Sequence, residues 1–257
     1  MTLVAGCGGD DSNGPNPPPV GKTIYALDLS NNFALFHSGS PGTVDRKLAI
    51  SGLPDGDRIV AFDFRPSDGK LYGVGTDSRV YVVDTVTAVA TAVGAAFTPA
   101  VAGEHFGMVL DPSTDQIRLQ SAESGQNLRL DPATGQVVAE DAALAYASGD
   151  PNEAEAPEIA ATAVSGASPT TYGIDWLLDV FVVMSDPSSG QVVTVGSTGV
   201  TTAPCAALDV GADGVMYASM TTSGINNLYT MNLSTGAATL LGEIDVVASI
   251  QSIAISN

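Results

Sequence analysis

The amino-acid sequence predicts an all-β protein, a single β-propeller with five blades of four-stranded antiparallel sheets. A phrase of short strands and Gly-containing turns recurs along the 257 residues at a near-constant interval. Repeats of about 40–50 residues that hold several strands each are typical of β-propellers. When the copies are aligned on their second strand, a Tyr or an Arg stands at the same position; these residues are Tyr25, Tyr72, Arg118, Tyr172 and Tyr217.

Four copies of the repeat are complete and account for four blades. Each begins with an apolar strand, passes through a polar turn, and continues into strands that end in a Gly-containing turn. Turns such as 67–69 (SDG) and 234–236 (STG) place Gly where a tight hairpin requires a positive φ. The complete copies span residues 59–94, 106–140, 159–196 and 205–242.

The fifth copy is divided between the two ends of the chain. Residues 22–29, 33–37 and 47–51 resemble the second, third and fourth strands of a repeat, and residues 249–256 resemble a lone first strand. If these segments pair, the ring closes and neither terminal strand keeps an unpaired edge. The sequence therefore predicts a propeller domain over residues 22–257, closed by its N- and C-terminal strands. We expect a monomer.

The N-terminal residues predict an exported lipoprotein. Residues 4–7 (VAGC) match the bacterial lipobox, whose Cys receives lipid, so Cys7 is the candidate lipidation site. Residues 1–6 are too few for a complete signal peptide, and we interpret them as its end, with a longer signal upstream. Residues 7–21, rich in Gly, Pro and Asn, predict a disordered tether. The expected location is the bacterial cell envelope, periplasmic or surface, with membrane contact through the Cys7 lipid; a chance match is the alternative.

The charge balance excludes one class of partner. The chain carries 28 acidic and 9 basic residues, a net charge of −19. Nucleic-acid binding requires a cationic surface, so we expect no nucleic-acid partner. Such acidity fits either a solubilising surface or a protein that meets divalent cations. The second cysteine, Cys205, lies in an apolar segment and is expected to be a small buried hydrophobic residue.

Candidate ligand-binding residues lie on the innermost strands, which line the central channel of a propeller. Their facing is uncertain by one residue, because neighbouring side chains of a strand point to opposite faces. The channel candidates are Asp63, Arg65, Asp111 and Asp209, with Ser165 and Ser252 beside them.

Two further groups of residues leave alternatives open. In the insertion over residues 142–157, Asp150, Asn152 and Glu153 supply oxygen ligands that could bind Ca²⁺, although the segment departs from the EF-hand pattern; otherwise it is a solvated acidic loop. Arg118 and Arg129 fit either structural ion pairs with Asp residues between blades or an anion site, and we favour ion pairs.

Short motifs lie in the strands and turns of the chain: 63–66 (DFRP), 71–72 (LY), 97–99 (FTP), 105–107 (HFG), 116–118 (QIR), 125–130 (GQNLRL), 144–147 (LAYA), 149–152 (GDPN) and 233–236 (LSTG). Together these motifs resemble an uncharacterised family of bacterial exported propeller domains, often lipoproteins. The resemblance runs from about Ile24 to the C-terminus and implies the fold and export, without an activity. Val109 departs from it, since such domains typically have Asp in the strand that follows Phe-Gly.

No catalytic constellation stands out in the sequence. With His37 and His105 as the two histidines, a Cys/His zinc site is excluded and a Ser-His-Asp triad is disfavoured. One Trp and 6% aromatic residues offer few platforms for sugars. We favour a non-catalytic binding or scaffolding module, with a protein or small-molecule ligand at the propeller mouth. The alternative is an extracellular hydrolase, glycosidase- or lactonase-like, that uses channel carboxylates and a metal such as Ca²⁺.

Overall fold

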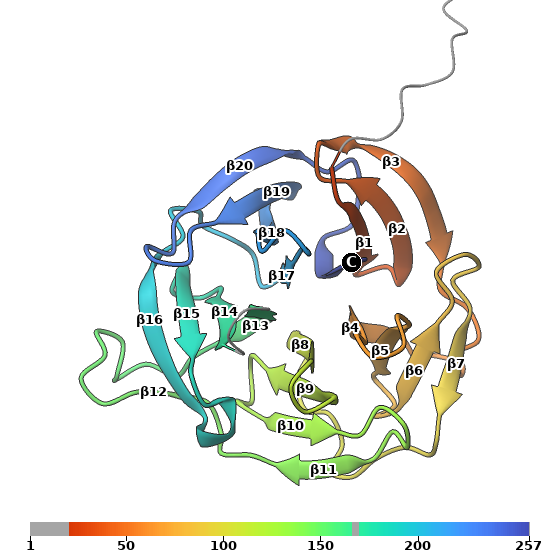
Figure 1. Cartoon of the computed structure of the whole chain (residues 1–257), viewed down its shortest axis with the longest axis horizontal. Coiled ribbons are helices and arrows are strands. Elements are labelled where there is room, and N and C mark those ends of the chain that lie inside the picture. Colours follow the sequence, from red (N-terminus) through yellow and green to blue (C-terminus); the bar gives the residue numbers. More distant parts are fainter. Residues whose placement is uncertain (1–20, 166–169, 257) are drawn as a thin grey trace, which may run out of the picture.

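The computed structural model of the chain is a ring of five small antiparallel sheets around a central channel, a five-bladed β-propeller (Figure 1). It describes residues 21–165 and 170–256. Cys7, the expected end of a signal peptide and nearly all of the expected tether lie outside the described residues. Within the described ranges there is no helix with the length and apolar character needed to cross a membrane. The predicted fold is confirmed.

Each blade has four strands that lie side by side, with the first strand at the channel and the fourth at the outside of the ring. Blade one is formed by β21 (Ile250–Ile255), β1 (Thr23–Asp28), β2 (Asn32–His37) and β3 (Ser40–Ala49). Blade two is formed by β4 (Ile59–Phe64), β5 (Leu71–Gly75), β6 (Val80–Val83) and β7 (Ala90–Val93). Blade three is formed by β8 (Phe106–Asp111), β9 (Gln116–Ser121), β10 (Asn127–Leu130) and β11 (Val137–Glu140).

Blades four and five complete the ring. Blade four is formed by β13 (Ile159–Ser165), β14 (Thr170–Asp175), β15 (Val180–Met184) and β16 (Gln191–Ser197), with a short 3₁₀-helix, η1 (Pro187–Ser189), before β16. Blade five is formed by β17 (Ala206–Val210), β18 (Met216–Thr222), β19 (Ile225–Met231) and β20 (Ala238–Glu243).

The ring closes through strands from the two ends of the chain. β21 pairs antiparallel with β1, so that Ile24 lies opposite Ile255 and Ala26 opposite Ile253. Ile24, Ile253 and Ile255 are buried between blades one and five. The predicted split blade is therefore confirmed, and the pairing removes the strand edge that each terminus would otherwise expose.

The five repeats share one register. Each aligned second-strand residue lies opposite an equivalent position on the first strand of its blade. Tyr72 faces Asp63, Arg118 faces Val109, Tyr172 faces Ala163, Tyr217 faces Asp209 and Tyr25 faces Ala254. This equivalence lets the channel-lining residues of different blades be compared position by position.

Apolar side chains fill the spaces between neighbouring blades. Phe33 of blade one packs near Phe62 of blade two, with ring centroids 6.3 Å apart, and Tyr81 is fully buried in the same cluster. Each such side chain contributes roughly 1.5–3 kcal/mol through removal from water. Gly135 and Gly236 occupy turns with φ of 70° and 78°, a region that disfavours other residues. The core thus fixes the five first strands around the channel.

The insertion before blade four adds a fifth strand to it. β12 (Ala145–Tyr146) pairs parallel with β16, with Tyr146 opposite Val192. Tyr146 is buried, and its hydroxyl donates to Oδ2 of the buried Asp175 at 2.8 Å. The insertion therefore covers the outer edge of blade four and is part of the folded domain.

Candidate functional site

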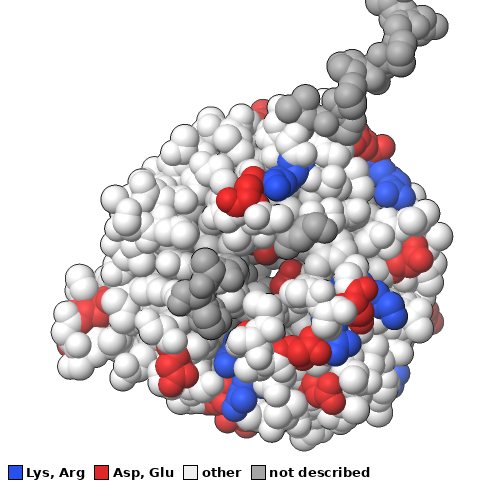
Figure 2. All heavy atoms as spheres, viewed as in Figure 1, with Lys and Arg blue, Asp and Glu red and all other residues white. Residues whose placement is uncertain are grey.

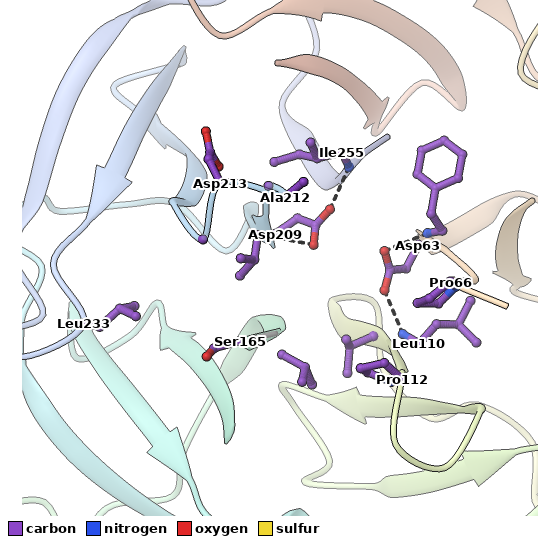
Figure 3. Close-up of a pocket in the computed structure, with 16 residues that line it drawn as sticks. Asp63, Pro66, Leu110, Pro112, Ser165, Asp209, Ala212, Asp213, Leu233 and Ile255 are labelled. Carbon is purple, nitrogen blue, oxygen red and sulfur yellow. Dashed lines mark hydrogen bonds between the residues drawn. The ribbon is translucent and has the colours of Figure 1, made fainter. Parts of the chain in front are cut away.

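A cavity of about 750 Å³ opens where the first strands of all five blades end (Figure 3). It lies on the face of the turns that join first to second strands. The side chains around it are mainly apolar, with three carboxylates and one hydroxyl among them. Its lining residues are Asp63, Phe64, Pro66, Val109, Leu110, Pro112, Val164, Ser165, Asp209, Val210, Gly211, Ala212, Asp213, Gly214, Leu233 and Ile255.

Asp63, at the end of β4, joins blade two to blade three. Its Oδ1 accepts the backbone N–H of Phe64 at 2.7 Å, and its Oδ2 accepts the N–H of Leu110 on β8 at 2.7 Å. Backbone N–H groups on the channel side of a first strand have no neighbouring strand to bond, and a buried amide needs an acceptor. The carboxylate of Asp63 supplies that acceptor to two blades at once.

Asp209, at the end of β17, does the same between blades five and one. It accepts the N–H of Val210 at 2.7 Å and the N–H of Ile255 on β21 at 2.6 Å. Two aspartates therefore satisfy the equivalent amides of four blades. Blade four has Ala163 at the position that an aspartate occupies in blades two and five. The equivalent amide in blade four is that of Val164, the next residue.

The two carboxyls point toward one another from opposite sides of the cavity (Figure 3). Asp63 is 8% exposed, and Asp209 is partly buried. Burial raises the pKa of Asp63 well above its usual range, and the charge of Asp209 raises it further, while the two amide hydrogen bonds oppose this. Burial raises the pKa of Asp209 to about 7. Within residues 21–165 and 170–256, no Lys, Arg or His lines the cavity to stabilise the ionised forms.

Arg65 and Asp111, the other two channel candidates, do not line the cavity and are engaged in ion pairs. The Arg65 guanidinium holds Asp115, with Nε 2.9 Å from Oδ1, and its central carbon lies 5.6 Å from the ring centroid of Tyr72. Asp111 accepts from the Ser113 hydroxyl at 2.6 Å and lies 3.4 Å from Nε of Arg118.

The two remaining candidates of the first strands lie at the channel. Ser165 lines the cavity at the end of β13. Ser252 is buried deeper, where its hydroxyl accepts the N–H of Phe62 at 3.2 Å and lies 3.1 Å from the Phe62 carbonyl oxygen. Ser252 therefore fastens blade one to blade two, as the aspartates fasten other pairs.

The two arginines of blade three share one carboxylate. Asp141 accepts a hydrogen bond from Nε of Arg129 at 2.8 Å and one from Nη1 of Arg118 at 3.3 Å. Asp141 pairs these residues within one blade, whereas Nη2 of Arg118 reaches the Ser188 hydroxyl of blade four at 3.4 Å. The arginines therefore form structural ion pairs, but with carboxylates of their own blade and not between blades as expected.

The oxygen-bearing side chains of the insertion hold it against β16. Asp150 accepts the N–H of Thr194 at 2.7 Å and its hydroxyl at 2.8 Å, and Asn152 donates to that hydroxyl at 3.0 Å. Glu153 accepts the N–H of Gly149 at 2.8 Å. Over residues 21–165 and 170–256, no group of three or more His, Cys, Asp or Glu side chains is arranged to hold a metal ion.

The basic residues are confined to one part of the chain, a signal that counting along the sequence can find. All 9 Lys and Arg residues lie between Lys22 and Arg129, which places them in blades one to three. Figure 2 shows that basic and acidic side chains are interspersed on one side of the channel mouth, whereas the visible surface of blades four and five carries only acidic ones.

Solved structures share the fold at low sequence identity. A chain of a nidogen/laminin complex has 9% identity and a TM-score of 0.54, over 92% of this chain and 99% of that chain. A protein from Lactobacillus plantarum has 17% identity and a TM-score of 0.50, over 91% of this chain and 71% of that chain. At such identities the likeness shows the fold alone.

Sequence comparison assigns the chain to a family. No curated protein matches it. A family model described as "Domain of unknown function (DUF4394)" matches residues 32–254, which includes strands of all five blades. This chain therefore belongs to that family of unknown function.

Proposed function

We propose that this protein is a non-catalytic binding propeller of the bacterial cell envelope, whose ligand occupies the channel cavity. The observation that carries the proposal is the cavity itself, about 750 Å³ in volume and lined by residues of all five blades. A volume of this size is typical of small-molecule sites, as is a mainly apolar wall with a few convergent polar groups. The rigid ring holds these groups in place without any need for ligand.

The hydrogen bonds of the carboxyls favour binding over catalysis. Asp63 and Asp209 each use their oxygens to accept two backbone N–H groups, so that each carboxyl has a structural task. A catalytic acid or base must be free to exchange a proton with the substrate. Among the lining residues that the structure describes, Phe64 is the only aromatic one, which offers little stacking surface for a sugar ring.

A hydrolase is the second candidate, and one observation favours it. General acids that work near neutral pH need a raised pKa, and burial raises the pKa of Asp209 to about 7. In that case Asp63 and Asp209 would act as the acid and base pair of an extracellular enzyme.

Envelope anchoring through Cys7 is part of the proposal and rests on the sequence motif. The described chain begins beside the cavity, because Nζ of Lys22 lies 3.5 Å from Oδ2 of Asp213 on the rim. A tether over residues 7–21 would therefore join the domain at the mouth of the channel. In this proposal the cavity faces the side from which the tether leaves.

A screen for ligands by thermal shift tests the proposal, with a cavity-filling variant beside the full-length protein. Ala212→Trp should fill the mouth from an exposed rim position, while Ala133→Trp places the same side chain on an exposed turn between β10 and β11. A compound that stabilises the wild type and Ala133→Trp but not Ala212→Trp supports a channel ligand. Compounds that stabilise all three proteins equally would count against it. Chromogenic glycosides and lactones test the second candidate. If the wild type hydrolyses them and Asp63→Asn does not, the protein is a hydrolase and the binding proposal is wrong.

A further inference from the structure

The channel cavity combines two inward-facing carboxyls with a lining that, among the described residues, contains no Lys, Arg or His. Asp63 and Asp209 approach from opposite sides, and Asp63 is more than nine-tenths buried (Figure 3). Their partners are uncharged backbone amides, so no positive charge of the protein balances them inside the cavity. An uncompensated buried carboxylate is costly, and a bound cation would relieve that cost.

The other charged groups at this face are already paired with one another. Lys22 pairs with Asp213 on the rim, at 3.5 Å. Arg65 pairs with Asp115 and Asp68, and the Tyr72 hydroxyl donates to Asp68 at 2.9 Å rather than to Asp63. Tyr217 lies on β18, directly opposite Asp209 of β17 in the strand pairing. The nearby cations are therefore held by other carboxylates, which leaves the central pair for a ligand.

The walls of the cavity select among cations. The other lining residues are mainly apolar and include Phe64, Pro66, Leu110, Pro112, Val164, Val210 and Ile255. Calcium requires about six to eight oxygen ligands at close range, and this lining offers few oxygens for such a shell. An organic cation can place its charge between the carboxyls and its hydrocarbon part against the walls. A cavity of about 750 Å³ has room for both.

We infer that the channel binds a small organic ammonium ion, a protonated amine with an apolar body, between Asp63 and Asp209. This inference rests on the proposed ligand-binding function and names the class of its ligand. The ammonium donates hydrogen bonds to the remaining lone pairs of the two carboxyls, whose other lone pairs keep the backbone amides.

Binding of such an ion should release protons. Below neutral pH the carboxyl pair holds protons, because burial raises the pKa of both groups. An incoming ammonium stabilises the ionised form, so a carboxyl proton passes to the buffer and the charge of the ammonium is balanced by the carboxylate left behind. The apparent affinity should therefore rise with pH up to about 7 and level off above it.

Isothermal titration calorimetry of the full-length protein with n-butylammonium tests the inference. Titration at pH 6 in two buffers of different ionisation enthalpy gives the number of protons released on binding. We expect release of up to one proton and tighter binding at pH 8 than at pH 6. This measurement needs only the wild-type protein, so it remains informative if a variant fails to fold. No heat of binding at millimolar n-butylammonium would overturn the inference.

Matched probes and variants separate this inference from the broader proposal. Asp63→Asn and Asp209→Asn should each weaken n-butylammonium binding at least about 30-fold, as loss of one partner of a buried charge pair does. Asp55→Asn removes one charge from an exposed site outside the cavity and should leave binding unchanged. If n-butanol binds as tightly as n-butylammonium and Ala212→Trp blocks it, the channel binds ligands but the ammonium class is wrong. If Ca²⁺ competes at equal concentration, the site is a metal site and the inference also fails.

Discussion

Asp63 and Asp209 perform the same structural task in two blades that are not neighbours. Each lies at the same position of a first strand, opposite Tyr72 and Tyr217 respectively. Each accepts the N–H of the residue that follows it and one N–H from the first strand of the next blade. The pair thus fastens blade two to three and blade five to one, while its two carboxyls face a shared cavity.

The contribution of Asp63 and Asp209 to the stability of the fold should fall as pH rises from about 4 to 7. Both carboxyls have raised pKa values in the folded protein, about 7 for Asp209, against about 3.9 for an unfolded aspartate. The folded state therefore binds more protons across this window, and stability is lost as they dissociate. Asp209→Asn should therefore reduce the change in the free energy of unfolding between pH 4 and 7 by on the order of 2 kcal/mol. This is less than the pKa difference alone would give, because Asp209 is partly exposed to solvent.

Urea unfolding at several pH values measures this effect. The asparagine keeps one acceptor but presents an N–H₂ group to the second amide, so the variant should be less stable than the wild type at pH 5. The difference should shrink or reverse by pH 8. Asp55→Asn, an exposed carboxylate, controls for the general loss of one negative charge. Parallel pH curves for the wild type and Asp209→Asn would refute the prediction.

The fold was predictable because its signals are local and repeated, whereas the facing of the channel residues was not. The first strands are buried on both faces, as in β4 and β8, so alternation of polar and apolar residues does not show which side chain reaches the channel. Asp63 reaches the cavity, but Arg65, two residues on, has left the strand and turns to Asp115. Contacts between neighbouring blades decide which side chains face the channel.

The docking of the insertion had no sequence signal of its own. A strand of two residues, β12, shows no periodicity, and its parallel pairing with β16 depends on a sheet formed by later residues. The polar composition of residues 149–155 suggested a ligand-binding or solvated loop, whereas Asp150 in fact bonds Thr194 across 44 residues of sequence.

Removal of the Arg118 side chain should destabilise blade three strongly. Its guanidinium lies between Asp111 and Asp141 with 8% of the side chain exposed. Arg118→Ala would leave the buried Asp111 without its counter-charge, while Asp141 keeps Arg129. Loss of one partner in a buried ion pair costs about 3–5 kcal/mol. Arg46→Ala, whose guanidinium makes an exposed bond to the Val86 carbonyl, should change the free energy of unfolding by less than about 0.5 kcal/mol. Equal effects of the two substitutions in urea unfolding would contradict this account.

Deletion of residues 249–257 should open the ring. It removes the buried side chains of Ile250, Ile253 and Ile255 and exposes the edge of β1 that now pairs with β21. Exposed strand edges promote aggregation. Size-exclusion chromatography should show soluble aggregates or no soluble protein, while deletion of Asn257 alone should leave the protein unchanged. A monomeric, cooperatively unfolding product of the longer deletion would show that closure by β21 is dispensable.

Cys7 should carry lipid when the chain is expressed with a complete bacterial signal peptide. The motif VAGC places small residues before the cysteine, as the lipobox requires. Metabolic labelling with an alkyne fatty acid should modify the wild type and not Cys7→Ser, and the wild type should fractionate with membranes. The buried Cys205 is the matched control, since Cys205→Ser should retain the label. If Cys7→Ser still incorporates the label, the lipid is not attached to Cys7 and the prediction is wrong.

Asp150→Ala should release the insertion from blade four while leaving the ring folded. The substitution removes acceptors for the N–H and hydroxyl of Thr194, which hold the loop on β16, and for the N–H of Asn152 within the loop. Each hydrogen bond contributes about 0.5–1.5 kcal/mol, so local opening should become easier by a few kcal/mol at most. Hydrogen exchange should accelerate over residues 145–155 and change little in β21. Glu155→Ala, an exposed carboxylate of the same loop, should not affect exchange there. Because Asp150 is already bonded to protein groups, millimolar Ca²⁺ should not protect this loop; protection that disappears in Asp150→Ala would instead establish a calcium site.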